Sequence, residues 1–229
     1  MHTILLDERT NDRSLAMTSS VTNMALAARF LGMHRQPAGY RQLGEQLSRA
    51  GETILQTAVQ PLALAAATRF RRAVFLASGA RFAAAREAAL KMLEMTDGRV
   101  ATLAETYLGV RHGPLVFVQP GTLVLCFLSS DRALRAYELD FIESLNRKNL
   151  GEVKVIFGQQ IPESLLRNHD VAIECSELRE IGDLDTPILD IIIGQLTAFF
   201  RCLAEGLRPD SPCQSGAIQR VVEGFPVHR

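Results

Sequence analysis

The sequence predicts a doubly wound α/β domain, in which helices cover both faces of a parallel sheet. Short apolar runs alternate with helix-length segments between about residues 50 and 206. These runs are apolar throughout, which is typical of parallel strands buried on both faces. The chain has 229 residues, 47% hydrophobic and 22% charged, so it can bury the core that such a domain needs.

The N-terminal part is expected to hold a short strand at residues 3–6, a polar loop and a helix from Ser20 to Leu31. Thr18, Ser19 and Ser20 stand at the start of that helix. Small hydroxyl residues are good N-caps, because the side-chain oxygen accepts from the first free backbone N–H groups. One strand and one helix cannot bury themselves, so this part must pack on something else.

A second helical pattern follows a linker. Gly32 and the segment MHRQPAGY after it lack periodicity, whereas the Ala-rich stretch from Arg41 to Arg69 has a helical pattern. Pro61 interrupts this pattern, because proline removes a backbone hydrogen bond and clashes with the preceding turn.

The central part alternates strands and helices in a βαβ manner. Gly113 and Pro114 precede one further apolar run, LVFV, whose composition is that of a buried strand. The expected strands are 73–77, 99–103, 122–128, 153–157 and 171–174, and the expected helices are 81–95, 104–111, a segment after Asp131 to about 148, and 187–205.

We therefore divide the chain into four parts. Residues 1–32 are too few for a core of their own, residues 33–50 form a linker and the start of a connecting helix, and residues 51–206 form the α/β domain. Residues 207–229 form a tail. Its segment VVEGFPV is too apolar for simple disorder, so we expect the tail to pack along the domain or across a partner subunit.

The charge balance argues against nucleic acid and membrane as partners. Lys and Arg together number 25, as do Asp and Glu, which leaves no basic or acidic excess to attract either surface. No apolar stretch approaches the roughly 18 residues of a membrane span, and the N-terminus does not resemble a signal peptide. A DNA-binding regulator is disfavoured, since no helix-turn-helix pattern precedes the domain.

The four cysteines are scattered and form no CxxC pair. We interpret Cys126, Cys175, Cys202 and Cys213 as reduced thiols of a cytoplasmic protein. The five histidines lack HxxxH spacing, so no metal site is expected, and without a P-loop or GxGxxG motif no cofactor is expected either.

The helix at 81–95 carries a stripe of charged side chains opposite its apolar side. Glu87, Lys91 and Glu94 fall within this stripe when the residues are wound at about 100° per step. One reading is a solvated face with an i,i+4 ion pair. The other is a carboxylate displayed at a cleft, available as a general base.

His112 stands where a short helix is expected to stop. Gly113 can take a left-handed cap, and Pro114 cannot continue a helix. A cationic histidine there is favoured by the helix dipole without any further role, and a catalytic role is the alternative.

Two stretches of small polar residues suit an anion. Ser129, Ser130 and Asp131 follow an expected strand, and the hydroxyl residues 18–20 precede a helix. An ordinary N-cap explains each stretch equally well.

Three stretches together resemble a known family: "REAALKMLEMTDGRVATLAETYLGVRHGPLVFV", "CFLSSDRALRAYELDFIESL" and "QLTAFFRCLAEGLRPDSPCQSGAIQRVVEGF". They are similar to the second sugar isomerase (SIS) domain of the AgaS-type tagatose-6-phosphate ketose/aldose isomerases and galactosamine-6-phosphate deaminases. The stretch "ERTNDRSLAMTSS" resembles the end of that family's first SIS domain. The resemblance implies a flavodoxin-like SIS fold, preceded by a remnant of a first SIS domain.

The resemblance also implies roles for particular residues. By similarity to the isomerase domain of glucosamine-6-phosphate synthase, Glu94 moves a proton between C1 and C2 of the open-chain sugar phosphate. His112 opens the sugar ring and comes from a neighbouring subunit, which implies a homodimer or larger oligomer. Thr18, Ser19 and Ser20 match the stretch that lines the sugar. Such a base needs a partly desolvated pocket, in which burial raises the pKa of a carboxyl group.

Two departures from the family pattern affect this reading. Most of a first SIS domain, with its Ser-rich phosphate loop, has no counterpart in the sequence. Arg220 stands near the position of the Schiff-base lysine of glucosamine-6-phosphate synthase, and arginine stays protonated and is no nucleophile. Acid–base isomerisation or deamination of a hexose or hexosamine 6-phosphate is therefore the leading hypothesis. The alternatives are an inactive SIS module that binds phosphosugars or only dimerises, and a longer natural protein in which Met1 is internal.

Overall fold

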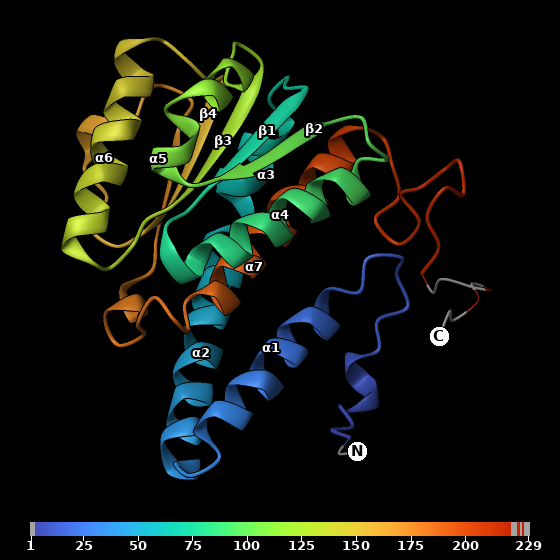
Figure 1. Cartoon of the computed structure of the whole chain (residues 1–229). Helices are drawn as coiled ribbons and strands as arrows, with labels where there is room; N and C mark the ends of the chain where they lie inside the picture. Colours follow the sequence, from blue (N-terminus) through green and yellow to red (C-terminus); the bar gives the residue numbers. More distant parts are fainter. Residues whose placement is uncertain (1–2, 221–223, 225, 227–229) are drawn as a thin grey trace.

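The computed structural model describes residues 3–220, 224 and 226. A five-stranded parallel sheet in the order β2-β1-β3-β4-β5 forms its centre (Figure 1). This order is that of flavodoxin-like doubly wound sheets, whose switch point lies between β1 and β3. The predicted fold class is confirmed. The strands are β1 (Arg72–Leu76), β2 (Ala101–Glu105), β3 (Thr122–Phe127), β4 (Val153–Gly158) and β5 (Val171–Glu174).

Helices cover both faces of this sheet. α3, α4 and α7 pack on one face, α5 and α6 pack on the other, and α2 extends from the first layer towards α1 (Figure 1). The helices are α1 (Thr18–Met33), α2 (Pro37–Thr57), α3 (Val59–Ala67), α4 (Phe82–Met95), α5 (Tyr107–Val110), α6 (Arg132–Arg147) and α7 (Pro187–Ala204).

The central strands are apolar throughout because both of their faces are covered. All six residues of β3 and all six of β4 are buried. Leu125 and Phe157 join the core beneath α4 and α7, whereas Val124 and Ile156 join the core beneath α6. Successive side chains point to opposite faces of a strand, so each strand feeds both cores.

Two expected strands are not strands. Residues 3–6 have no regular structure, and Leu5 is 89% exposed, because no neighbouring strand is present to pair with this run. The first three residues of the run LVFV belong instead to a 3₁₀ segment, Gly113–Phe117, and Val118 follows it. Gly113 is not among the glycines with a positive φ, so the expected left-handed cap does not form there. β2 begins two residues later than the sequence pattern suggested.

The helix boundaries differ from expectation for local reasons. α1 begins at Thr18 rather than Ser20, and the linker contracts because α2 begins at Pro37, a residue well suited to a first helical turn. The break before α3 lies at Ala58, not at Pro61. A proline ring clashes with the carbonyl four residues earlier, here that of Thr57, so the long helix ends there.

α7 is the central helix of the layer formed with α3 and α4. Gly194 lets α7 approach α4 closely, because a Cβ at this position would lie 2.4 Å from the Cβ of Ala88. A fully buried ion pair between Arg81 and Asp190 joins the N-terminal ends of α4 and α7, with Nη2 of Arg81 2.6 Å from Oδ1 of Asp190. Within the described residues, α7 is the one helix long and apolar enough to cross a membrane, and 56% of it is buried inside the protein. The prediction that no stretch approaches this length was therefore wrong.

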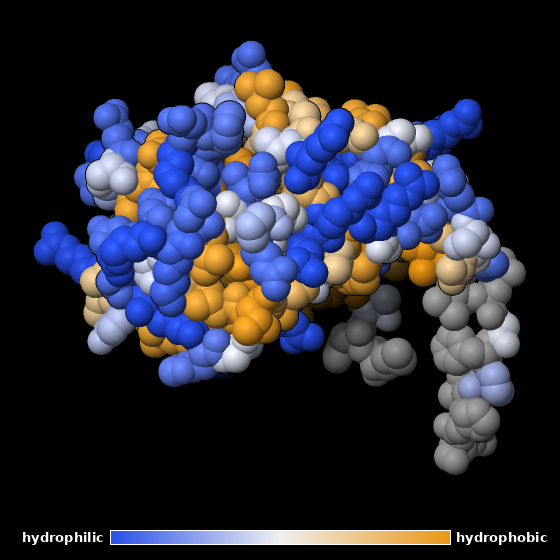
Figure 2. All heavy atoms as spheres, turned by 90° about the horizontal axis from the view of Figure 1, so that it is seen from above, coloured by the Kyte–Doolittle hydropathy of each residue, from blue (hydrophilic) through white to orange (hydrophobic). Residues whose placement is uncertain are grey.

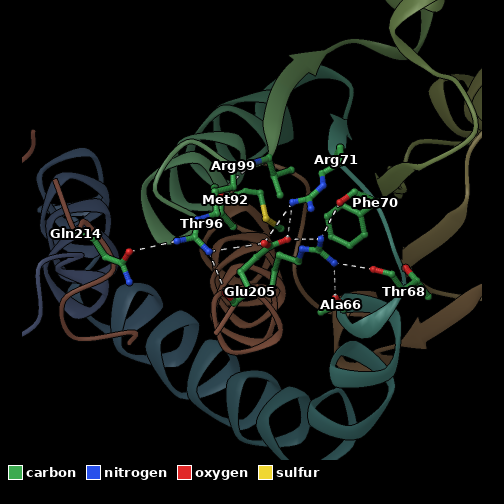
Figure 3. A network of polar contacts seen from close by, with 11 residues as sticks. Ala66, Thr68, Phe70, Arg71, Met92, Thr96, Arg99, Glu205 and Gln214 are labelled. Carbon is green, nitrogen blue, oxygen red and sulfur yellow. Dashed lines mark hydrogen bonds and ion pairs between the residues drawn. The ribbon is translucent and has the colours of Figure 1, made fainter. Parts of the chain in front are cut away.

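The C-terminal end of α7 is tied to the start of the sheet by arginines (Figure 3). The Arg201 guanidinium donates to the carbonyls of Thr68 and Phe70 and pairs with Glu205, which Arg71 also approaches at 3.3 Å. Arg201 thus satisfies carbonyl groups after α3 that have no helical partner, a common need at helix C-termini.

The described part of the tail packs on the N-terminal segment and contacts the α/β domain, where Arg99 donates to the side chain of Gln214 at 3.4 Å, so it follows the first of the two predicted courses. The Leu15 N–H donates to the carbonyl of Asp210 at 3.1 Å, and the Arg220 guanidinium donates to the side chain of Asn11. Most of VVEGFPV lies outside the described residues.

Candidate active site

Glu94 lies in a cavity between α1, α4 and the tail. The cavity has a volume of about 360 Å³, and its walls include Ser20 of α1, Glu94 of α4 and Arg220 of the tail. The Glu94 side chain is 26% exposed, so it faces the cavity without being fully open to solvent. The structure therefore brings together Glu94 and Ser20, two of the residues that the sequence singled out.

The charged stripe on α4 is not a solvated face. Lys91 is buried, and its ammonium group pairs with Glu94 while lying 3.5 Å from Oε1 of Glu87. Burial raises the pKa of Glu87, the nearby Lys91 charge opposes that rise, and the Glu94 charge adds to it. The stripe is thus a partly desolvated carboxylate–ammonium–carboxylate group at the edge of the cavity. The charged residues form both the predicted i,i+4 pair and the predicted cleft edge.

Lys91 also lines a second cavity of about 490 Å³, between α1 and the α4–α7 layer. Thr18 and Ser19 face this second cavity. The amide of Gln195 on α7 donates to the carbonyl of Thr18 at 3.2 Å and so ties the start of α1 to the core. The polar Gln195 within the apolar α7 is the sequence signal that could have revealed this contact.

The start of α1 already holds an anion. The Asp12 carboxylate accepts from the backbone N–H of Ser19 at 2.7 Å and from its hydroxyl at 2.8 Å, and the Ser20 hydroxyl donates to the carbonyl of Thr10. The residue at the N-cap is Met17, which has no side-chain cap, so the expected capping by residues 18–20 is wrong. The carboxylate satisfies free N–H groups that a sulfate or phosphate would otherwise attract.

The Ser129–Ser130 turn is filled in the same manner. The Asp183 carboxylate accepts from both serine hydroxyls and, at 2.9 Å, from the backbone N–H of Ser130. Burial alone would raise the pKa of Asp183, but these hydrogen bonds outweigh burial and lower it. Asp131 is an ordinary N-cap of α6 that accepts two backbone N–H groups. The anion at the turn after β3 is therefore the Asp183 carboxylate of the same chain.

His112 does not reach Glu94 within one chain. It is exposed, and it follows α5, which packs with α6 on the face of the sheet opposite α4 (Figure 1). His112 lines neither of the two cavities that α4 borders. Since α5 and α4 lie on opposite faces, an imidazole beside Glu94 would have to come from another copy of the chain.

The donor set does not suggest a metal centre. Among residues 3–220, 224 and 226, no three His, Cys, Asp or Glu side chains form a group that could hold a metal ion. Within the same range all four cysteines are free thiols, and only Cys213 is not buried. The chemistry available at the cavity is that of a lysine-bridged pair of carboxylates, an arginine and a hydroxyl.

Sequence comparisons find relatives named D-galactosamine-6-phosphate deaminase AgaS. The chain is 35% identical over 223 residues to the D-galactosamine-6-phosphate deaminase AgaS of Shewanella sp., and covers 53% of it. It is 30% identical to the AgaS of Escherichia coli, of which it covers 58%. These alignments use 97% and 98% of the chain, respectively. The chain thus spans just over half the length of these relatives.

A solved structure supports the same grouping. A tagatose-6-phosphate ketose/aldose isomerase from Escherichia coli superposes with a TM-score of 0.82 at 28% identity. The superposition covers 98% of this chain and 57% of the other. A scan against models of protein families finds no match.

Proposed function

The chain belongs to the AgaS-type family of sugar isomerase (SIS) domain proteins, and from this premise we propose that it acts on a hexose or hexosamine 6-phosphate as a ketose/aldose isomerase or deaminase. The observation that carries the proposal is the shared cavity of Glu94 and Ser20, with the buried Lys91 beside the carboxylate. These features match the requirements for moving a proton between two carbon atoms. A base must be held in place, partly removed from water, and a polar wall must bind hydroxyl groups.

The reaction assigns Glu94 one proton-transfer role. In the open-chain aldose, Glu94 removes the proton from C2, and the electron pair moves through C1 onto the carbonyl oxygen to give an enediolate. Glu94 then returns the proton to C1. The hydroxyl at C2 gives up its proton to the oxyanion at C1, so the C2 oxygen becomes the ketose carbonyl and the C1 oxygen becomes a hydroxyl. With an amino group at C2, the same transfer yields an imine at C2, and water replaces the nitrogen to release ammonia.

The ring-opening step calls for a second copy of the chain. His112 is exposed, and the neighbouring side chains of Leu108 and Val116 are 51% and 76% exposed. Beside Glu94, Leu90 and Leu93 are also exposed. Apolar side chains next to both halves of the site support a homodimer or larger oligomer, in which His112 of one copy approaches Glu94 of another. Such an enzyme of sugar-phosphate metabolism, with free cysteines, fits a cytoplasmic location.

The test is turnover of galactosamine 6-phosphate, followed by release of ammonia and appearance of ketose. We expect Glu94→Gln to lower kcat by about 10²–10⁴, the usual contribution of a general base. Glu52→Gln, an exposed glutamate on α2, serves as the matched control and should leave turnover unchanged. Undiminished turnover in Glu94→Gln would reject the proposal. Binding of the sugar phosphate by calorimetry without any product would favour the second candidate, a phosphosugar-binding module.

A further inference from the structure

Arg220 places a permanent positive charge in the cavity of Glu94. It lies in the described part of the tail and lines the cavity together with Ser20 and Glu94. Its side chain is half-buried, and Nη2 donates to the side chain of Asn11 in the N-terminal segment. The tail and the N-terminal segment thus hold the guanidinium at the cavity wall.

Among the described residues, no carboxylate pairs with Arg220. Four charged side chains line the cavity within the described residues: Glu87, Lys91, Glu94 and Arg220. Lys91 is engaged by both glutamates, so its charge is already balanced. Arg220 contacts only a neutral amide, and its Nε is buried without any hydrogen-bond partner in the described part of the chain. Asp210 lines the neighbouring cavity, not this one.

A cation in this position has a chemical use. Removal of a proton next to a carbonyl group places negative charge on an oxygen, and a fixed positive group beside that oxygen stabilises the transition state more than the ground state. A guanidinium is well suited, since it stays protonated and presents several N–H donors in one plane. A buried donor without a partner is costly unless a ligand supplies the acceptor.

Building on the proposed function, we propose that Arg220 is a catalytic residue that binds the oxygen on which the enediolate charge develops, within the cavity that it shares with the Glu94 carboxylate. Lys91 holds Glu94 in place, and Arg220 supplies the compensating charge. A role in binding the phosphate group of the substrate is the alternative, and the two roles predict different kinetics.

The kinetic test compares Arg220→Gln and Arg220→Lys with the wild type on galactosamine 6-phosphate. For Arg220→Gln we expect kcat to fall by about 10²–10³, as for other groups that stabilise a developing oxyanion, with KM changed much less. Arg220→Lys keeps the charge but loses the planar fork, so its kcat should lie between the other two. Arg208→Gln, an exposed arginine of the same tail outside the cavity, is the control and should match the wild type. An unchanged kcat with a raised KM would overturn the proposal in favour of phosphate binding.

A binding measurement separates this inference from the proposed function. A phosphorylated aldonohydroxamate carries the planar, anionic oxygens of an enediolate, whereas a hexitol 6-phosphate carries only hydroxyl groups and the phosphate. By calorimetry, the wild type should prefer the hydroxamate, and Arg220→Gln should lose that preference while still binding the hexitol phosphate. Equal preference in both proteins would overturn the inference even if the enzyme turns over. A wild type that neither binds nor converts any phosphosugar would instead refute the proposed function, and this inference with it.

Discussion

Lys91 illustrates how a single neighbour changes the meaning of a residue. On periodicity alone the charged stripe of α4 is best explained as a solvated surface, because the spacing of Glu87, Lys91 and Glu94 is that of ordinary ion pairs along a helix. In the structure Lys91 is buried beside the cavity and contacts both carboxylates. A desolvated charge must be paired, so the two glutamates and the lysine stabilise one another and fix the geometry of the candidate base.

The thiols give a residue-level prediction about reactivity. Burial raises the pKa of Cys126 to about 12 and that of Cys175 and Cys202 to about 11, whereas a hydrogen bond with Ser215 leads the contacts that lower the pKa of Cys213. Only the thiolate is nucleophilic, so as pH rises Cys213 should become reactive first, and at pH 8 the three buried thiols remain protonated. Iodoacetamide should therefore label Cys213 alone in the native protein, as read by mass spectrometry. Labelling in denaturant should reach all four cysteines, and native labelling of Cys126 would contradict the buried core.

At the level of elements, the contact between α4 and α7 positions the candidate base. α4 carries Glu94, and its close approach to α7 depends on Gly194 facing Ala88. The fully buried pair of Arg81 and Asp190 holds the N-terminal ends of the same two helices together. Breaking such a pair leaves an unpaired buried charge, so this helix contact tolerates little change.

Gly194→Ala tests the importance of that contact. The added methyl group would meet the Cβ of Ala88 at 2.4 Å and its Cα at 3.0 Å, so α4 must shift. We expect the free energy of unfolding to fall by about 1–3 kcal/mol, the usual cost of overpacking a core. Turnover should fall as well, since the shift displaces Glu94. Chemical denaturation and the galactosamine 6-phosphate assay measure the two effects.

Gly44→Ala is the matched control on α2. A Cβ at this position would meet nothing within 4 Å. Since alanine is the better helix former, the substitution should stabilise the protein by about 0.5–1 kcal/mol without affecting turnover. Equal destabilisation by both substitutions would show that the α4–α7 contact is not special.

At the scale of the whole molecule, the two halves of the candidate site lie on opposite faces of one sheet. Glu94 belongs to the layer of α4 and α7, and His112 follows α5 on the side of α6. Seen from above, hydrophobic side chains gather in patches between hydrophilic ones (Figure 2). Large apolar side chains are exposed beside both residues, including Leu93 next to Glu94 and Val116 near His112. Association of two copies would cover such side chains and bring the halves together.

Complementation tests this arrangement directly. Glu94→Gln and His112→Gln should each be inactive alone, because each removes one half of every site. In a mixed dimer one site carries both substitutions and the other carries neither, so an equal mixture should recover about a quarter of wild-type turnover after subunits exchange. Sedimentation should find a dimer or larger species. Failure of the mixture to regain activity, with exchange confirmed by mass spectrometry, would contradict a histidine contributed by a second copy.

The sequence by itself determined the parallel sheet and most of its helices. Runs that are apolar at every position require burial on two faces, and this requirement is local, so the bounds of β3, β5 and α7 follow it to within about one residue. The prediction of a strand at residues 3–6 was wrong, because a strand forms only when another strand pairs with it. The local composition of a segment does not show whether such a partner is present.

Only the tertiary structure decided which polar residues meet. Asp12 reaches the start of α1 and Asp183 reaches the turn after β3 from 54 residues further along the chain. Arg220 reaches the cavity of Glu94 although 126 residues separate them in the numbering (220 − 94). Charges and hydrogen bonds act over a few ångströms in space and leave no periodic signal in a sequence, whereas hydrophobic burial does. The residues of the site are therefore identified only from the folded structure, in which the sheet fixes the positions of the helices that carry them.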